Sequence, residues 1–170
     1  FDFSEKDACG VGFIASRNIP PTHAMTLTLL ECFANLDHRG AKFADGTGDG
    51  AGVLTEIPFE LLRAELEELN IEHDVNKKIG IISCFFDPKN IDESKELINS
   101  ELSNSGIKLL YWRKVPTDKQ ILGDLARDSK PSIYQGIISA ENETHKNFEK
   151  KLFLFRKVQK KKILEVEFLN

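Results

Sequence analysis

The chain has 170 residues, of which 41% are hydrophobic and 29% are charged, and its formal net charge is −4 at neutral pH. This composition is typical of one folded domain and excludes a disordered chain, and the weak negative charge gives no general attraction to nucleic acid or membranes. The three cysteines, Cys9, Cys32 and Cys84, form no CxxC pair, which favours reduced thiols and a cytoplasmic location. The sequence has no apolar run of membrane-spanning length and no signal peptide.

The first predicted element is a buried strand over residues 11–15, directly after Cys9. Gly10 and Gly12 weaken this strand, and glycine at such positions often marks a close approach of backbone or ligand. Cys9 therefore stands at the mouth of a strand, where its thiol could face a substrate. The alternative is the common fate of a free cysteine, which is to be a small buried apolar side chain.

The rest of the chain alternates between helices and strands. Helices are predicted over 22–41, 59–70, 90–106, 119–131 and 141–162, and strands at the end of 48–58 and over 77–88, 107–116, 132–139 and 163–170. Thr22 can cap the first helix, and Gly40 and Gly106 are typical stops. Apolar residues recur along one face of two helices: Leu29, Phe33 and Leu36 in the first, and Phe148, Leu152, Phe155 and Val158 in the last. Cys32 and Cys84 fall in apolar surroundings, so we expect both to be buried.

The final predicted strand ends the chain without a turn or a partner. Leu164, Val166 and Phe168 alternate along it, and an open edge strand invites misassociation. We therefore expect the chain to be the first part of a larger domain. The alternative is that the tail pairs with an interior strand and closes the sheet.

A glycine-rich loop follows the first predicted helix. Its four glycines, at positions 46, 48, 50 and 52, predict unusual backbone angles and a close approach to another group. The loop is not a Walker loop, because no Lys-Ser/Thr follows it. Asp45 and Asp49 give it a faint likeness to a calcium loop. The alternating oxygen donors and the acidic twelfth position are missing, so we do not expect a metal.

Two residues near the end of the first helix are candidates for chemistry. Arg39 either interacts with the last carbonyls of the helix or offers a two-pronged site for a carboxylate. His38 is better interpreted as an ordinary helix-end histidine than as the partner of Cys9 in a catalytic dyad.

Taken together, the motifs resemble a known family. ACGVGFIA, LDHRGA and ADGTGDGAGVLTEIP, in this order and spacing, resemble the N-terminal glutaminase domain of glutamate synthase large subunits, which is a class II glutamine amidotransferase domain. SKPSIYQGIIS followed by FEKKLFLFRKVQKK resembles a later strand and basic helix of that domain. Residues 65–120 match by layout more than by motif.

The resemblance implies an α+β fold of the N-terminal-nucleophile type, a four-layer αββα sandwich of which this chain is the first part. Residues 1–8 would be a leader, and 9–170 the N-terminal part of the amidotransferase domain. Removal of the leader would make Cys9 the first residue, so that its α-amino group, with a pKa near ~8, serves as the base for the thiol. Arg39 would clamp the α-carboxylate of glutamine. The site-forming loop would consist of Gly46, Thr47, Gly48, Asp49 and Gly50.

The implied activity is hydrolysis of L-glutamine to glutamate and ammonia through a Cys9 thioester, with the ammonia passed on for glutamate synthesis from 2-oxoglutarate. FMN and an iron–sulfur cluster would lie in other domains, and the partners would be the rest of the chain and an electron-donor subunit or ferredoxin. The family's Asn-Gly oxyanion pair and its amino-binding Asp have no counterpart in this chain, so we expect the segment alone to be inactive. A non-catalytic glutamine-binding or regulatory module, or a purely structural fragment, is the alternative.

Overall fold

A computed structural model describes residues 10–18, 20, 22–48, 50–73, 79–140 and 144–167. The chain divides into two compact units. Unit 1 contains Phe1–Glu56 and Asp118–Lys130, and unit 2 contains Ile57–Thr117 and Pro131–Asn170. Unit 1 therefore takes a short segment from the connection between two strands of unit 2.

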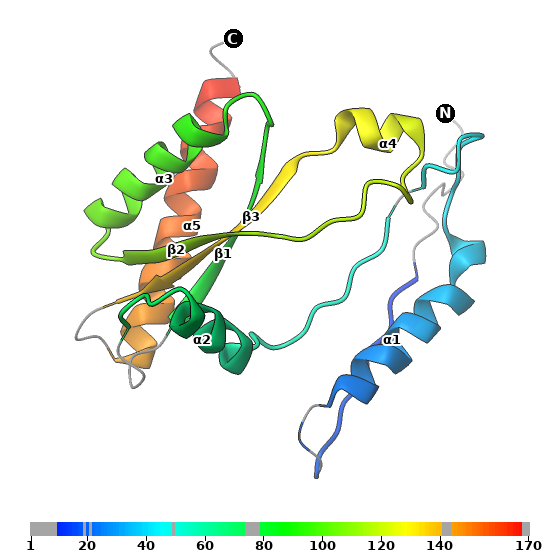
Figure 1. Ribbon diagram of the computed structural model, residues 1–170, viewed down its shortest axis with the longest axis horizontal. Helices are drawn as coiled ribbons and strands as arrows, with labels where there is room; N and C mark the ends of the chain where they lie inside the picture. Colours follow the sequence, from blue (N-terminus) through cyan, green and yellow to red (C-terminus); the bar gives the residue numbers. More distant parts are fainter. Residues whose placement is uncertain are drawn as a thin grey trace, which may run out of the picture. The chain divides into compact units, whose positions relative to one another are not determined.

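Unit 2 is built on a three-stranded antiparallel sheet (Figure 1). Its strands are β1 (Ile79–Phe86), β2 (Lys108–Lys114) and β3 (Ser132–Ser139), in the order β1-β3-β2. Ile79 pairs with Ser139 and Phe86 with Ser132, and the pairing of β2 with β3 is irregular between Leu109 and Tyr111. All three strands lie where the sequence predicts them, so the prediction of a mixed α and β fold is confirmed.

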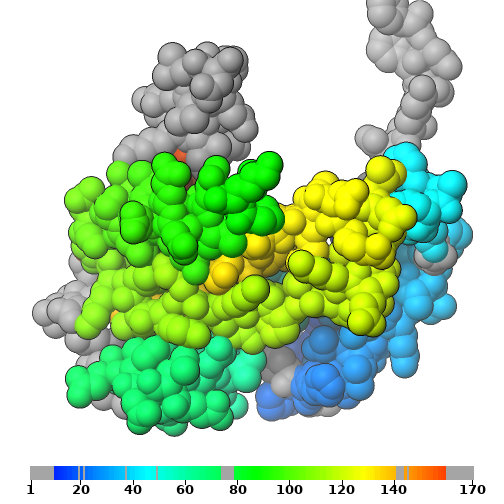
Figure 2. Space-filling view, turned by 45° about the horizontal axis from the view of Figure 1, so that its top comes forward, coloured from blue at the N-terminus to red at the C-terminus, as the bar shows by residue number. Residues whose placement is uncertain are grey.

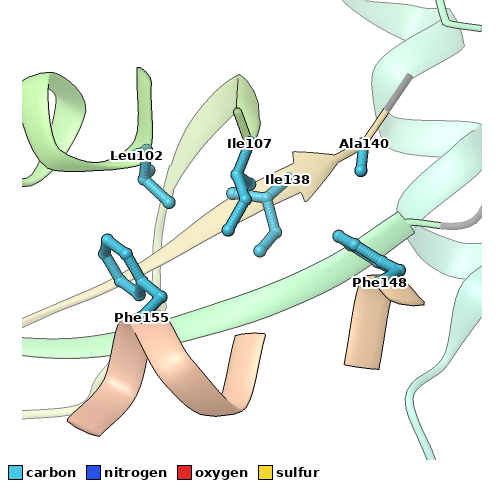
Figure 3. Packing of buried hydrophobic residues seen from close by; sticks show 6 residues of the cluster. All are labelled: Leu102, Ile107, Ile138, Ala140, Phe148 and Phe155. Carbon is cyan, nitrogen blue, oxygen red and sulfur yellow. The ribbon is translucent and has the colours of Figure 1, made fainter. Parts of the chain in front are cut away.

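The helices α3 (Ile91–Asn104) and α5 (His145–Glu167) pack on one face of this sheet. In Figure 3, Phe148 and Phe155 of α5 point toward Ile138 of β3, with Leu102 of α3 beside them. The buried cluster consists of Leu102, Ile107, Ile138, Ala140, Phe148 and Phe155. The two phenylalanines lie two turns apart on one face of α5, as the periodicity predicts. Val158, predicted on the same face, is 47% exposed instead.

The helix α2 (Phe59–Glu68) covers the opposite face of the sheet. Its buried Leu62 and Leu66 pack against Ile137 of β3. Ile137 and Ile138 belong to clusters on opposite faces of the sheet, because successive side chains of a strand point to opposite faces. The sheet of unit 2 is therefore the middle of three layers. Figure 2 shows α3 and α2 on either side of the β2 segment.

The predicted stop of α3 at Gly106 is confirmed. Gly106 has a φ of +66°, a conformation that glycine adopts without strain. Its N–H donates to the Ser103 carbonyl at 3.0 Å, and the N–H of Ile107 donates to the Leu102 carbonyl at 3.0 Å. This pair of bonds is a Schellman motif, and the contact between Ile107 and Leu102 in the core completes it.

Unit 1 contains the helix α1 (His23–Asn35), the 3₁₀ turn η1 (Asp37–Arg39) and the short helix α4 (Asp124–Ser129). The predicted apolar face of α1 is half-buried at Leu29, Phe33 and Leu36, and no residue of α1 is fully buried. Thr22 occupies the N-cap position, but its side chain makes no capping hydrogen bond.

Two segments of unit 1 that were predicted as strands are not strands. Residues 10–16 and 50–56 have no strand structure, and most of their apolar side chains are exposed, including Val11 by 95%, Phe13 by 89% and Leu54 by 97%. A strand needs a neighbour for its backbone ladder, and within the described residues neither segment pairs with one. The second sheet that a four-layer sandwich requires is accordingly not present in the described parts of the chain.

The prediction of a final strand is also wrong as far as Glu167, because α5 continues through Leu164 and Val166. Phe168 lies outside the described residues. No Gly or Pro interrupts the chain after His145, and an established helix propagates readily through Leu, Glu and Lys. Although α5 has 23 residues, no helix in the described ranges is both long and apolar enough to cross a membrane.

Candidate active site

Gly10 lies against the motif that carries Arg39. A Cβ atom at Gly10 would be 3.0 Å from Cδ1 of Leu36, so an added side chain would fit only if the Leu36 side chain shifted by a few tenths of an ångström. Leu36 is the C-cap of α1 and precedes η1. The structure therefore brings together the first two motifs singled out in the sequence. Cys9 itself lies outside the described residues.

Arg39 ends η1 and is exposed, and its backbone N–H donates to the Leu36 carbonyl at 2.8 Å. Among the described residues, its guanidinium forms no ion pair. The turn thus presents Arg39 on the surface of unit 1, with its two-pronged donor group available for a carboxylate.

His38 fits the helix-end interpretation. Its side chain is exposed, and Nδ1 lies 3.1 Å from the Asn35 carbonyl oxygen. A ring nitrogen facing a carbonyl must carry the proton, so this contact assigns the hydrogen to Nδ1.

The start of the glycine loop is a tight hairpin. Lys42 and Gly48 form an isolated antiparallel bridge, and the N–H of Phe43 donates to the Thr47 carbonyl at 2.7 Å. Gly46, at the tip, has a φ of +83°, which agrees with the predicted unusual backbone angles. Asp49, another predicted member of the loop, lies outside the described residues.

Asp45 accepts hydrogen bonds from protein groups. Its Oδ1 accepts from the Thr47 N–H at 3.0 Å, and its Oδ2 accepts from the Thr47 hydroxyl at 2.8 Å and from the Leu125 N–H at 3.0 Å. These bonds hold the pKa of the Asp45 carboxyl below its ordinary value, with Leu125 contributing most. The described residues contain no group of three or more His, Cys, Asp or Glu side chains that could hold a metal ion.

The other two cysteines differ from each other. Cys32 is exposed, which corrects the prediction that it is buried, because α1 fully buries none of its residues. Cys84 is half-buried on β1, and burial raises the pKa of its thiol to about 11. A thiol with so high a pKa is almost entirely protonated at neutral pH and is a poor nucleophile.

A groove of about 1100 Å³ lies beside β1, between α3 and α5, and Cys84 is among its lining residues. Of the predicted site residues that the structure describes, none lines this groove. The groove belongs to unit 2, whereas Arg39 and the glycine loop belong to unit 1.

Sequence reasoning did not find the link between the glycine loop and α4. Asp45 and Leu125 are 80 positions apart, and neither local sequence reveals that the two segments meet. The available signal was Gly123, a glycine inside the helix predicted over 119–131.

Comparison with known proteins decides the family. The profile of the family described as "Glutamine amidotransferases class-II" matches residues 9–169, so the match begins at Cys9 and covers nearly the whole chain. The chain belongs to the class-II glutamine amidotransferases.

Its relatives are glutamate synthases, as the motifs predict. The chain is 38% identical over 154 residues to the ferredoxin-dependent glutamate synthase of Pyropia yezoensis, which covers 90% of this chain and 10% of the relative. It is 36% identical over 159 residues to the glutamate synthase [NADPH] large chain of Bacillus subtilis, a match that covers 90% of this chain and 10% of the relative. It is 33% identical over 169 residues to the glutamate synthase [NADH] of Saccharomyces cerevisiae, a match that covers 90% of this chain and 8% of the relative. This amidotransferase chain spans about a tenth of the length of these relatives.

Proposed function

We propose that this chain is the glutaminase part of a glutamate synthase, and that the full-length protein uses it to hydrolyse L-glutamine to L-glutamate and ammonia. The observation that carries the proposal is the family match over residues 9–169, which begins at the cysteine that the sequence offers as an N-terminal nucleophile. The similarity to glutamate synthases over 90% of the chain supports it.

The proposed reaction uses Cys9 after removal of residues 1–8. The freed α-amino group takes the thiol proton, and Sγ attacks the side-chain amide carbon of glutamine. The carbon–nitrogen bond breaks as the nitrogen takes the proton held by the α-amino group, and it leaves as ammonia. Water then attacks the thioester, so that its hydroxyl joins the acyl carbon, its remaining proton returns to the thiolate, and glutamate is released.

The geometry of unit 1 supports two further assignments. Gly10, which follows Cys9, touches Leu36 of the motif that contains Arg39, so a substrate at Cys9 would lie near a cation suited to its α-carboxylate. The hairpin formed by residues 42–48 belongs to the same unit and would supply a wall of the site with Gly46, Thr47 and Gly48, continued by Asp49 and Gly50.

The proposal extends to the rest of the protein. Ammonia would pass to a second site for glutamate synthesis from 2-oxoglutarate, with FMN and an iron–sulfur cluster held by other domains. The names of the relatives specify ferredoxin, NADPH or NADH, so we infer that the electron donor is a ferredoxin or a donor subunit that uses NADPH or NADH. A four-layer αββα arrangement and a cytoplasmic location belong to the same proposal.

The test is covalent labelling of the full-length protein, processed so that Cys9 is the first residue, with an electrophilic glutamine analogue. We expect labelling at Cys9 alone, protection by L-glutamine, and loss of both labelling and ammonia release in Cys9→Ala. Cys32→Ala is the matched control, because Cys32 is exposed but lies outside the proposed site. This variant should label and release ammonia as the wild type does.

Equal labelling of Cys32 and Cys9 would contradict the assignment, because it would show simple thiol accessibility. Glutamine protection without ammonia release would favour the non-catalytic glutamine-binding module instead.

A further inference from the structure

The hairpin of the glycine loop is fastened to α4 by a set of contacts that we call the latch, made by Asp45, Thr47, Gly123 and Leu125. The Asp45 carboxylate accepts the Leu125 N–H at 3.0 Å, at the start of α4, and also accepts two bonds from Thr47. In Figures 1 and 2, the yellow α4 segment lies against the cyan segment that contains this hairpin.

Gly123 makes this close approach possible. A Cβ atom at this position would be 2.4 Å from Thr47 Oγ1 and 2.8 Å from both the carbonyl oxygen and Oδ2 of Asp45. Real Cβ atoms do not come so close to other atoms, and one of these contacts is with backbone, which cannot swing aside. The fit of the hairpin on α4 therefore requires glycine at position 123.

Asp45 is suited to its place in a way that asparagine is not. Its Oδ2 accepts two of the three hydrogen bonds, from the Thr47 hydroxyl and the Leu125 N–H. An asparagine in the same position would offer one oxygen and one NH₂ donor. The donor would face another donor, so part of the latch would be broken without any change in side-chain volume.

We propose that the latch positions the glycine loop for glutamine binding, with Asp45 and Gly123 as positioning residues rather than catalytic ones. This inference rests on the proposed function, since it assigns the loop to the glutamine site. The physical reason is conformational entropy, because a segment with four glycines between positions 46 and 52 has many backbone states. The contacts with α4 hold Asp45 and Thr47 at the start of this segment, and so reduce the number of these states before the substrate arrives.

The test compares Asp45→Asn with wild type in the full-length protein by two measurements, amide hydrogen exchange and glutaminase kinetics. We expect faster exchange at the Leu125 and Thr47 amides and a glutamine KM raised about 10-fold, with kcat changed less than about threefold, because a loosened wall weakens binding. Asp128→Asn is the matched control, since it removes an exposed carboxylate from the same helix. It should leave both measurements unchanged.

A second set of variants keeps the latch testable if Asp45→Asn fails to fold. Thr47→Val removes the hydroxyl donor to Asp45 and should behave as Asp45→Asn does, with faster exchange at the Leu125 amide and a raised KM. Gly123→Ala should have the largest effect, because its Cβ collides with Thr47 and Asp45.

Faster exchange with an unchanged KM would overturn the positioning role. A raised KM without faster exchange would overturn the latch and assign Asp45 a direct contact with glutamine. A wild-type protein without glutaminase activity would overturn the proposed function, and the exchange measurement would then decide separately whether the latch holds the hairpin.

Discussion

Cys84 should react with a disulfide reagent far more slowly than an ordinary cysteine, because its thiol is half-buried on β1. Burial penalises the charged thiolate and raises the pKa of Cys84 to about 11. A free cysteine has a pKa near ~8.5. The experiment adds an aromatic disulfide reagent at a series of pH values to a variant that lacks Cys9 and Cys32, so that Cys84 is the thiol that reacts.

Two opposing factors set the reaction rate of Cys84: the small fraction of thiolate lowers the rate, and the higher nucleophilicity of that thiolate raises it. At pH 8, about a quarter of a free cysteine is thiolate but only about 0.1% of Cys84, which slows Cys84 by roughly 240-fold. A thiolate with a higher pKa is intrinsically more nucleophilic, with a Brønsted slope near ~0.45, and this recovers roughly 13-fold. The net rate should therefore be about 20-fold below that of a free cysteine, before any shielding by neighbouring side chains.

The assay follows release of the aromatic thiol, with the modified residue identified by mass spectrometry. The rate for Cys84 should rise about tenfold per pH unit from pH 8 to 10 without reaching a plateau, because the plateau lies above the pKa. The same protein unfolded in urea should show the free-cysteine rate and a plateau above pH ~8.5. A native rate equal to the unfolded rate, or a native plateau near pH ~8.5, would refute burial as the cause.

Three further predictions concern the proposed site and the core. Arg39→Ala should raise the glutamine KM at least about 10-fold in steady-state assays of the full-length enzyme, because the two-pronged donor is lost. Arg39→Lys should not restore the wild-type KM, because an ammonium group cannot make the paired contact. Unchanged kinetics in Arg39→Ala would mean that Arg39 has only a structural role at the end of the helix. Leu66→Ala should destabilise unit 2 by about 2–5 kcal/mol in urea unfolding, because Leu66 is fully buried against the sheet, whereas Leu61→Ala, 56% exposed on the same helix, should cost less than about 1 kcal/mol. Gly106→Ala should cost about 1–2 kcal/mol by the same measurement, because its φ of +66° strains any residue with a Cβ; a loss near zero would mean that the turn changes conformation.

Several features of the fold could be predicted because they depend on neighbours in sequence. The strand pattern SIYQGIIS predicted β3 with the bounds that the structure has. Gly106 predicted the end of α3, because a left-handed residue is needed there and glycine supplies it locally. The order and spacing of three short motifs predicted the family, which the match over residues 9–169 confirms.

Other features depended on which distant segments meet. Residues 10–16 have the apolar composition of a strand, but a strand exists only where a partner completes its ladder, and composition does not reveal the partner. Cys32 lies among apolar residues in the sequence, yet it is exposed, because α1 fully buries none of its residues. The last turns of α5 also differ from the prediction, because an established helix continues through a short alternating pattern that would be typical of a strand.

The sequence by itself determined the residue types of the proposed site, namely the cysteine, the arginine and the run of glycines, since these carry the chemistry wherever they are placed. Only the tertiary structure decided that Gly10 touches Leu36 beside the Arg39 turn, and that Asp45 fastens the glycine hairpin to α4 from 80 positions away. The physical reason is that a hydrogen bond or a close contact between distant segments depends on how the intervening chain folds, and no local pattern specifies that path.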